Sequence, residues 1–354
     1  MSGPEQGATY AQAGVDIDAG DRAVELMRSA VRRTHRPEVV GDLGGFAGLF
    51  AFDTSRYRKP LLASSTDGVG TKLAIAQQTG LHDTVGIDLV AMVTDDLVAC
   101  GAEPLFLQDY IACGKVVPER IAAIVAGIAE GCQQAGCALV GGETAEHGGL
   151  MKPDEYDLAA TAVGVVDADN VLKPDSVRVG DVVIAMGSSG LHSNGFSMVR
   201  HVLLSGAEMP LDSTVDDLDD DRPLGEVLLT PTRIYTKDCL ELIVETQVRV
   251  LAHITGGGLA GNLVRVLPPT VDAVVDRSTW QVPSVFQLVA GRGRVEQDEM
   301  ERTFNMGVGM VAVVSADEAD RALAVLTARH VPAWACGEIV AGTGEARMVR
   351  SYAP

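Results

Sequence analysis

The chain has 354 residues and a formal net charge of −20, with 47% hydrophobic and 4% aromatic residues, and its length predicts two domains. The acidity argues against a nucleic-acid partner, because binding a phosphate backbone needs clustered Lys and Arg. Because the sequence has no signal-peptide pattern and no long apolar run, we expect a cytoplasmic protein with no membrane partner.

Strands and helices alternate in the first half of the sequence. Apolar runs predict strands, and amphipathic runs bounded by Pro or Gly predict helices. The expected strands are residues 60–65, 105–113, 138–140 and 156–166, and the expected helices are residues 71–79, 87–100 and 118–135. Polar residues interrupt the pattern at 167–177. We therefore predict one domain over residues 1–170 and a second over residues 171–354.

The second half continues the alternation. The expected strands are residues 181–186, 248–254, 270–275, 307–314 and 333–340, and the expected helices are residues 196–205, 231–245, 259–267, 282–290 and 317–329. This pattern predicts an α/β (α+β) fold of mixed sheets with helices on one face.

A glycine-rich segment, GSSGLHSNG at residues 187–195, follows one of these strands and precedes a helix. A strand, a glycine-rich turn and a helix start direct several backbone N–H groups at one point, which suits a phosphate. The expected substrate contacts are Gly187, Ser188, Ser189, Gly190, His192, Ser193 and Asn194. The alternative is a turn that binds no ligand.

A second loop, TDGVGTK at residues 66–72, ends the strand expected at 60–65. It lacks the spacing of a P-loop. Its Asp67 is a candidate ligand for a divalent cation, and its Lys72 is a candidate phosphate contact. The alternative is an Asp that closes a turn and a solvated Lys.

Acids interrupt the apolar helix expected at 87–100. Asp88 and Asp95 are seven residues apart and so lie along one line of the helix, with Asp96 beside it. Buried carboxylates need partners, which a metal or Lys72 would supply. For Asp88 the alternative is a charge favoured by the helix N-terminus.

Three more polar residues stand near strand ends. Glu143 follows two glycines and is a candidate cation or nucleotide contact, or else an exposed acid of a turn. Asp109 is a weaker metal candidate. His253 precedes TGGG at residues 255–258 and is a candidate acid–base group, or else a structural histidine.

Together these segments resemble the aminoimidazole ribonucleotide synthetase family, the phosphoribosylformylglycinamidine cyclo-ligases. The motifs that carry the resemblance are GVDIDAG, TDGVGTK, GGETAE, GLHSNG, PTRIY and AHITGGG, beginning at residues 14, 66, 141, 190, 231 and 252. The resemblance covers about residues 10–340. Thiamine-monophosphate kinase and a hydrogenase-maturation protein share the family's fold but not this whole series of motifs.

The resemblance implies an ATP-driven ring closure in de novo purine biosynthesis, with formylglycinamidine ribonucleotide as substrate and with ATP and Mg²⁺ as cofactors. ATP phosphorylates the formamide oxygen, a nitrogen of the amidine side attacks, and phosphate leaves. The resemblance also implies a homodimer whose N-terminal domains share a barrel. Residues 14–20 look unstructured and are expected to form a mobile flap over the nucleotide, with a plain tail as the alternative.

The resemblance assigns roles to individual residues. The expected cofactor contacts are Asp16, Asp18, Asp67, Gly68, Gly70, Thr71, Lys72, Asp88 and Glu143, and the expected metal ligands are Asp67, Asp88, Asp96, Asp109 and Glu143. The expected catalytic residues are Lys72, His192 and His253, and Thr232 and Arg233 join the substrate contacts. Asp95 stands where the family often has Asn. A small-molecule kinase of the same fold and a scaffold without activity are the alternative functions.

Overall fold

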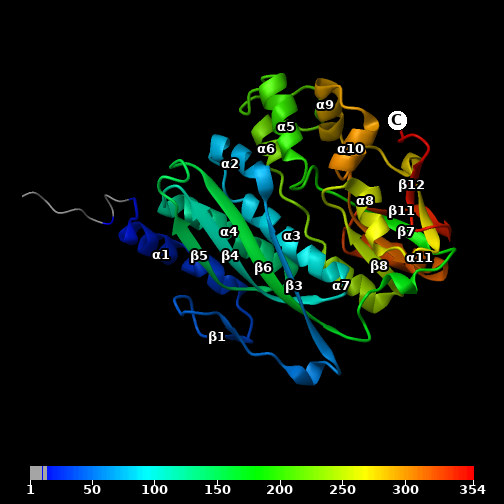
Figure 1. Ribbon diagram of the computed structural model, residues 1–354, viewed down its shortest axis with the longest axis horizontal. Coiled ribbons are helices and arrows are strands. Elements are labelled where there is room, and N and C mark those ends of the chain that lie inside the picture. The colour runs from blue at the N-terminus through cyan, green and yellow to red at the C-terminus, as the bar shows by residue number, and fades with distance from the viewer. Residues whose placement is uncertain (1–9, 11–13) are drawn as a thin grey trace, which may run out of the picture.

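The computed structural model describes Tyr10 and residues 14–354, and its strands form two main sheets (Figure 1). The first sheet has the order β3-β6-β4-β5 and is mixed, because β4 and β5 are parallel while the other pairs are antiparallel. Its strands are β3 (Pro60–Gly68), β4 (Glu103–Cys113), β5 (Ala138–Glu146) and β6 (Tyr156–Asp167). A separate two-stranded ribbon pairs β1 (Val39–Val40) with β2 (Leu49–Phe50).

Helices cover one face of the first sheet, as the sequence predicts. Along β4, Leu107 and Ile111 are buried while Gln108 and Tyr110 are exposed, which is the alternation of a sheet covered on one side. The helices of this half are α1 (Ile17–Thr34), α2 (Leu73–Thr79), α3 (Val85–Ala99) and α4 (Pro118–Ala135). A Cβ at Gly86 of α3 would lie 2.3 Å from the backbone nitrogen of Ile128. Only glycine therefore permits this close approach of α3 and α4.

The second sheet has the order β12-β9-β11-β7-β10-β8, and its strands β7 and β10 are buried on both faces. In β7, Val183 and Ala185 pack on the side of α8, while Ile184 and Met186 pack on the side of α7 and α11. The expected arrangement, with helices on one face of the sheet, therefore holds for the first sheet only. The strands are β7 (Val182–Gly187), β8 (Val248–His253), β9 (Val271–Asp276), β10 (Val308–Val314), β11 (Ala333–Ala341) and β12 (Ala346–Val349).

Short helices complete the second half. They are α5 (Phe196–Val199), a π-helix (Arg200–Gly206), α6 (Leu224–Leu228), α7 (Thr236–Glu245), α8 (Gly258–Leu263), α9 (Ser284–Gly293), α10 (Gln297–Thr303) and α11 (Ala319–Ala328). No helix in the described part of the chain is long and apolar enough to cross a membrane.

Two sequence expectations about local structure are wrong. Residues 14–20 are not an unstructured segment, because α1 begins at Ile17 and the Asp16 carboxylate caps it by accepting a hydrogen bond from the N–H of Ala19. The helix expected at 231–245 begins only at Thr236.

The late start of α7 has its cause in α3. The Asp95 carboxylate accepts hydrogen bonds from the backbone N–H of Tyr235 at 3.0 Å and from the Thr236 hydroxyl at 2.8 Å, so a side chain of the first half caps a helix of the second. The sequence alone does not predict this cap, because Asp95 and the start of α7 are 140 residues apart. In Figure 1, α3 lies between the two sheets, where it contacts both β3 and β8.

Burial makes Asp95 a pH-dependent element of stability. Desolvation raises the pKa of its carboxyl to about 6, against an ordinary value of 3.8. Between about pH 4 and pH 6 the native state holds this proton more tightly than the unfolded chain, so stability falls as pH rises through that window. The cost of the charged carboxylate is complete above the upper pKa and corresponds to about 3 kcal/mol.

We predict that Asp95→Asn removes this loss, because an amide oxygen still accepts both hydrogen bonds and carries no charge. In urea unfolding, the variant should gain stability over the parent at pH 8 and gain much less at pH 4.5. Asp154→Asn is the matched control, since that side chain is 94% exposed. Identical pH dependence in the parent and Asp95→Asn would contradict the prediction.

Candidate functional site

The buried pair Lys72–Asp88 joins the two halves of the chain. Both side chains are fully buried, and Lys72 Nζ lies 2.9 Å from Asp88 Oδ1. Lys72 also donates to the carbonyl oxygens of His192 at 3.0 Å and Thr230 at 2.8 Å. The N–H and hydroxyl of Thr232 donate to Asp88 Oδ1. One ammonium and one carboxylate thus hold both the GLHSNG loop and the PTRIY segment.

This pairing limits what Lys72 and Asp88 can contact. Burial lowers the pKa of Lys72, and the Asp88 carboxylate opposes that effect. Neither group faces the surface here, so a direct contact with a phosphate or a metal would require the pair to open. In this geometry Lys72 and Asp88 contact each other and the loops around them, and Thr232 belongs to the same network.

The loop at 187–195 is held from several sides. The Ser188 hydroxyl bonds Asn305 Oδ1 at 3.0 Å, and the Ser189 hydroxyl donates to the Pro231 carbonyl at 2.7 Å. The N–H of Arg233 donates back to the Ser189 hydroxyl, while its guanidinium donates to the carbonyl of His330. The loop is thus rigid before any ligand arrives, and its serines are largely engaged in holding it.

His192 is buried in this loop in the left-handed region, at φ 60°, instead of standing exposed on a turn. Its Nε2 accepts a hydrogen bond from the N–H of Ser189 at 3.1 Å, and burial holds the pKa of the imidazole well below its ordinary value. The neutral ring must therefore carry its proton on Nδ1. That Nδ1–H is buried and has no partner among the described residues.

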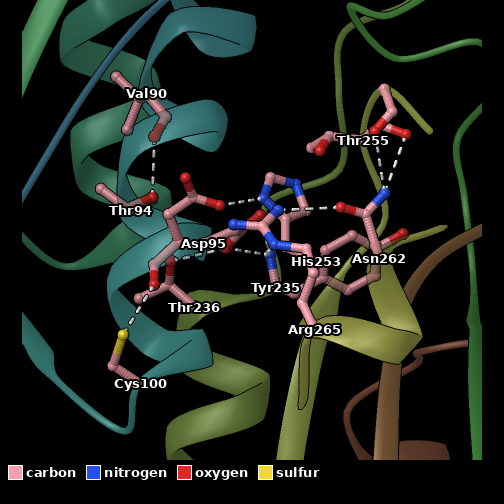
Figure 2. Close-up of polar contacts among 12 residues, drawn as sticks. Val90, Thr94, Asp95, Cys100, Tyr235, Thr236, His253, Thr255, Asn262 and Arg265 are labelled. Carbon is pink, nitrogen blue, oxygen red and sulfur yellow. Dashed lines mark hydrogen bonds and ion pairs between the residues drawn. The ribbon is translucent and has the colours of Figure 1, made fainter. Parts of the chain in front are cut away.

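His253 has the opposite arrangement (Figure 2). Its Nδ1 lies 2.9 Å from Asp96 Oδ1, so the neutral ring carries its proton on Nδ1 and leaves Nε2 as an acceptor. Nε2 is buried and unpartnered in the part of the chain that the structure describes. The Asp96 side chain, at the end of α3, is 47% exposed. Asp96 and His253 therefore form a carboxylate–imidazole pair with a free basic nitrogen.

The two histidines lie close together around Gly309. A Cβ at Gly309 would lie 2.5 Å from His192 Cε1, and the Gly309 carbonyl accepts from the N–H of Ile254, next to His253. The two rings thus lie on either side of one residue of β10, and one offers a buried donor nitrogen while the other offers a buried acceptor nitrogen.

The GLHSNG loop and the TGGG turn meet at the same place. A Cβ at Gly256 would lie 3.6 Å from Asn194 Oδ1, and Asn194 Nδ2 and the Ser193 hydroxyl are buried without partners in the described residues. Unpaired buried donors are costly, so several on one loop indicate a ligand site. The structure thus brings His192, Ser193, Asn194 and His253 together.

The TDGVGTK loop lies against the second half through Thr71, whose hydroxyl is 3.1 Å from that of Ser197. Gly70 has φ 76°, which glycine adopts without strain, and a Cβ at Gly68 would lie 2.9 Å from the Leu158 carbonyl. Asp67 is exposed at the end of β3, and its carboxylate accepts a hydrogen bond from the N–H of Gly68.

The remaining predicted acids do not gather around one point. Asp67 and Asp109 both oppose Ala160, so they lie on one face of the sheet about 10 Å apart, with β6 between them. Burial raises the pKa of Asp109 to about 7. Among the described residues no three of His, Cys, Asp and Glu are placed to hold a metal together. Asp18 lies in the first turn of α1, beyond the Asp16 cap.

Asp109 and Glu143 line a pocket of about 310 Å³ in the first half. Its other walls come from one face of α1, including Ala23 and Met27, and from the glycine-rich residues 42–48. An apolar pocket with carboxylates at one side is a usual form of small-molecule site.

Sequence reasoning missed Tyr235 and Asn262. The buried Tyr235 hydroxyl donates to the Gly187 carbonyl at 2.8 Å, and Asn262 Nδ2 donates to the carbonyls of Thr255, Gly256 and Gly258. Tyr235 stands inside the recognised PTRIY motif, which was the available signal. Nothing in the local sequence distinguishes Asn262 from a surface amide.

Comparisons with known proteins show which family the chain belongs to. A family model described as "AIR synthase related protein, N-terminal domain" matches residues 53–166, and one described as "AIR synthase related protein, C-terminal domain" matches residues 178–350. The chain is 55% identical to a phosphoribosylformylglycinamidine cyclo-ligase of Anaeromyxobacter dehalogenans, over 96% of this chain and 97% of the relative. It is 52% identical to that of Myxococcus xanthus, over 97% and 99%.

Solved structures with a similar fold are more distant in sequence. Thiamine-monophosphate kinase from Stenotrophomonas maltophilia superposes with a TM-score of 0.65 at 19% identity, covering 94% of this chain and 97% of that one. Hydrogenase maturation protein HypE in complex with ATP gives 0.64 at 18% identity, covering 93% and 91%. These likenesses show the fold alone, whereas the sequence identities extend over nearly the whole chain. The chain therefore belongs to the phosphoribosylformylglycinamidine cyclo-ligase family.

Proposed function

We propose that this chain catalyses the ATP-dependent cyclisation of formylglycinamidine ribonucleotide to aminoimidazole ribonucleotide, with release of ADP and phosphate, in purine biosynthesis. Family membership supports the reaction, since relatives above 50% identity carry the cyclo-ligase name. The observation that carries the proposal is the opposite hydrogen-bonding state of the two histidines. Ring closure needs a donor toward one oxygen and an acceptor for a proton from one nitrogen, and the site offers one of each.

The roles follow from these states. His192 Nδ1–H donates to the formamide oxygen or to the phosphoryl group placed on it, without bringing a full charge. His253 Nε2 takes the proton from the attacking nitrogen, and the Asp96 carboxylate stabilises the resulting imidazolium. Phosphate then leaves as the imidazole ring forms. The Ser193 hydroxyl and Asn194 amide hold the substrate beside the histidines.

We also propose where ATP and Mg²⁺ bind. The pocket beside α1 suits the apolar base of ATP, with Glu143 and Asp109 at its polar side. Mg²⁺ is commonly held by one or two carboxylates together with phosphate oxygens, and the exposed Asp67 offers one carboxylate for such a site. The donor chemistry therefore fits, although no preformed cage of three acids exists among the described residues. When bound, the cation would neutralise the triphosphate charge.

A homodimer in the cytoplasm completes the proposal. Leu62 is 69% exposed and Tyr110 is 40% exposed, and both lie on the face of the first sheet that the helices leave uncovered. Exposed apolar side chains on one sheet face favour an interface between two copies of the chain. Sedimentation at micromolar concentration tests this association.

A small-molecule kinase is the alternative, since thiamine-monophosphate kinase shares the fold. A kinase would leave a phosphorylated product, whereas a cyclo-ligase releases free phosphate and an aminoimidazole. Incubation with formylglycinamidine ribonucleotide, ATP and Mg²⁺, followed by diazo coupling of the aminoimidazole, separates the two activities. Absence of the coloured product together with consumption of ATP would contradict the proposal.

We predict that turnover requires Mg²⁺. We also predict that Asp67→Asn loses most activity while the fold persists, because Asp67 is exposed at the end of β3 and Asn keeps its size. Raising the Mg²⁺ concentration should restore part of the lost activity. Turnover that survives complete chelation by EDTA would disprove the metal role, and a collapse of the fold in Asp67→Asn would make this residue structural.

We predict that His192→Asn lowers kcat by roughly 10²–10³-fold, the usual effect of removing a donor aimed at developing charge. Asn tolerates the left-handed backbone at this position, so the folded state should persist. KM for ATP should change less than kcat. His201→Asn is the control, because His201 is exposed a short distance along the chain. If His192→Asn turns over as fast as the parent, the proposed catalytic role of this histidine is wrong.

We predict that Lys72→Met destabilises the fold by about 3–5 kcal/mol, because it leaves the Asp88 carboxylate buried without a counter-charge. The double variant Lys72→Met/Asp88→Asn should recover most of the stability and measurable activity. Denaturant unfolding and turnover are measured on all three proteins. A stable double variant without any activity would instead support a direct phosphate contact by Lys72.

A further inference from the structure

A cleft of about 370 Å³ lies between the two halves. Residues 63–65 of β3 and the end of α3 form one wall, and β8 and the residues after α8 form the other. Asp96 and His253 line it, and so does Arg265, which sits in the single 3₁₀ turn that follows α8. The cleft therefore reaches the carboxylate–imidazole pair from the side of Arg265.

The Arg265 guanidinium is exposed and forms no ion pair with any described carboxylate; its one side-chain hydrogen bond runs from Nη1 to Asn262 Oδ1 at 3.1 Å. In a chain with a net charge of −20, most arginines have acidic neighbours available. A cation without such a partner, at the mouth of a cleft, attracts an anion.

Asn262 fixes the position of this arginine. Its Nδ2 donates to the carbonyls of Thr255, Gly256 and Gly258, at 2.9 to 3.2 Å, so the amide cannot rotate. The amide oxygen is thereby directed at Arg265, as Figure 2 shows. The guanidinium is held to the same turn that follows His253, and its remaining N–H groups are left for a ligand.

A second observation points to a ligand in this cleft. His253 is 5% exposed, and its Nε2 has no partner among the described residues. Among the described residues the buried His253 Nε2 lacks a hydrogen-bonding partner and the Arg265 guanidinium lacks a charged one, and a bound group could supply both. After His253 accepts a proton, its Nε2–H becomes a donor to the same anion.

From this geometry we propose that Arg265 is a phosphate-binding residue of the cleft. The guanidinium binds a phosphate oxygen pair in the forked geometry that Arg favours, and His253 lies next to that group. The inference rests on the proposed cyclo-ligase function, in which a phosphate is present as the 5-phosphate of the substrate ribose and as the phosphoryl group that leaves. Both sources share the chemistry of a phosphate monoester or inorganic phosphate.

The test is direct binding, measured by calorimetry on the full-length protein with ribose 5-phosphate and with inorganic phosphate as probes. Arg265→Gln should weaken binding of at least one probe by roughly 10–100-fold, the usual effect of losing charge-assisted hydrogen bonds. Arg265→Lys keeps the charge but loses the fork, and should give an intermediate loss. Arg294→Gln is the control, because Arg294 is exposed in the same half and does not line the cleft.

Steady-state kinetics then identifies the source of the phosphate. A raised KM for formylglycinamidine ribonucleotide with kcat retained assigns Arg265 to the ribose phosphate. A lowered kcat with KM retained, together with weaker inhibition by inorganic phosphate, assigns it to the leaving phosphoryl group.

The inference is overturned if the parent and Arg265→Gln bind phosphate equally, or if the parent binds none. Either result leaves the proposed cyclo-ligase function standing. If the parent protein forms no aminoimidazole, the proposed function is contradicted, whatever the calorimetry shows.

Discussion

The structure depends on the need of buried carboxylates for partners. Helix α3 carries Asp88 and Asp95, and both side chains are fully buried, which removes the solvation that a carboxylate has at the surface. Asp88 finds Lys72 and Thr232, and Asp95 finds the start of α7. Because Thr232 and α7 belong to the second half, satisfying these charges forces the two halves to dock in one orientation.

This docking places the reactive groups. The carbonyl of His192 accepts from Lys72, and the imidazole of His253 pairs with Asp96 of α3. Each histidine is therefore oriented by a residue of the first half, although both belong to the second. Separating the halves would remove the Asp96 partner that orients His253 and the Lys72 contact that holds the backbone of His192.

Membership of a fold shared with kinases does not decide the chemistry. The kinase and HypE structures have the same overall arrangement at 18–19% identity. The proposed cyclo-ligase chemistry rests instead on the hydrogen-bonding states of His192 and His253, because one ring leaves a buried donor and the other a buried acceptor without a partner among the described residues. The cleft lined by Arg265 also reaches His253, and we propose it as the place where a phosphate group is held.

Most regular elements follow from the sequence, because their apolar periodicity is local. The strands at 60–65, 105–113 and 156–166 appear with shifted ends, and β5 continues to Glu146, six residues beyond the expected strand. Helix α1 escaped prediction because its acidic start reads as a polar tail. The Asp16 cap of α1 and the packing of α1 against α4 are seen only in the tertiary structure.

The sequence by itself also singled out the GLHSNG loop, the two histidines and the acids of α3, and these segments meet where the two halves are in contact. It did not determine their roles. Spacing marks Lys72 as a phosphate contact and Asp88 as a metal ligand, yet the tertiary structure pairs them with each other. The physical reason is that the partner of a buried charge is set by the folding of distant segments together, and residues 72, 88, 192 and 232 meet only there.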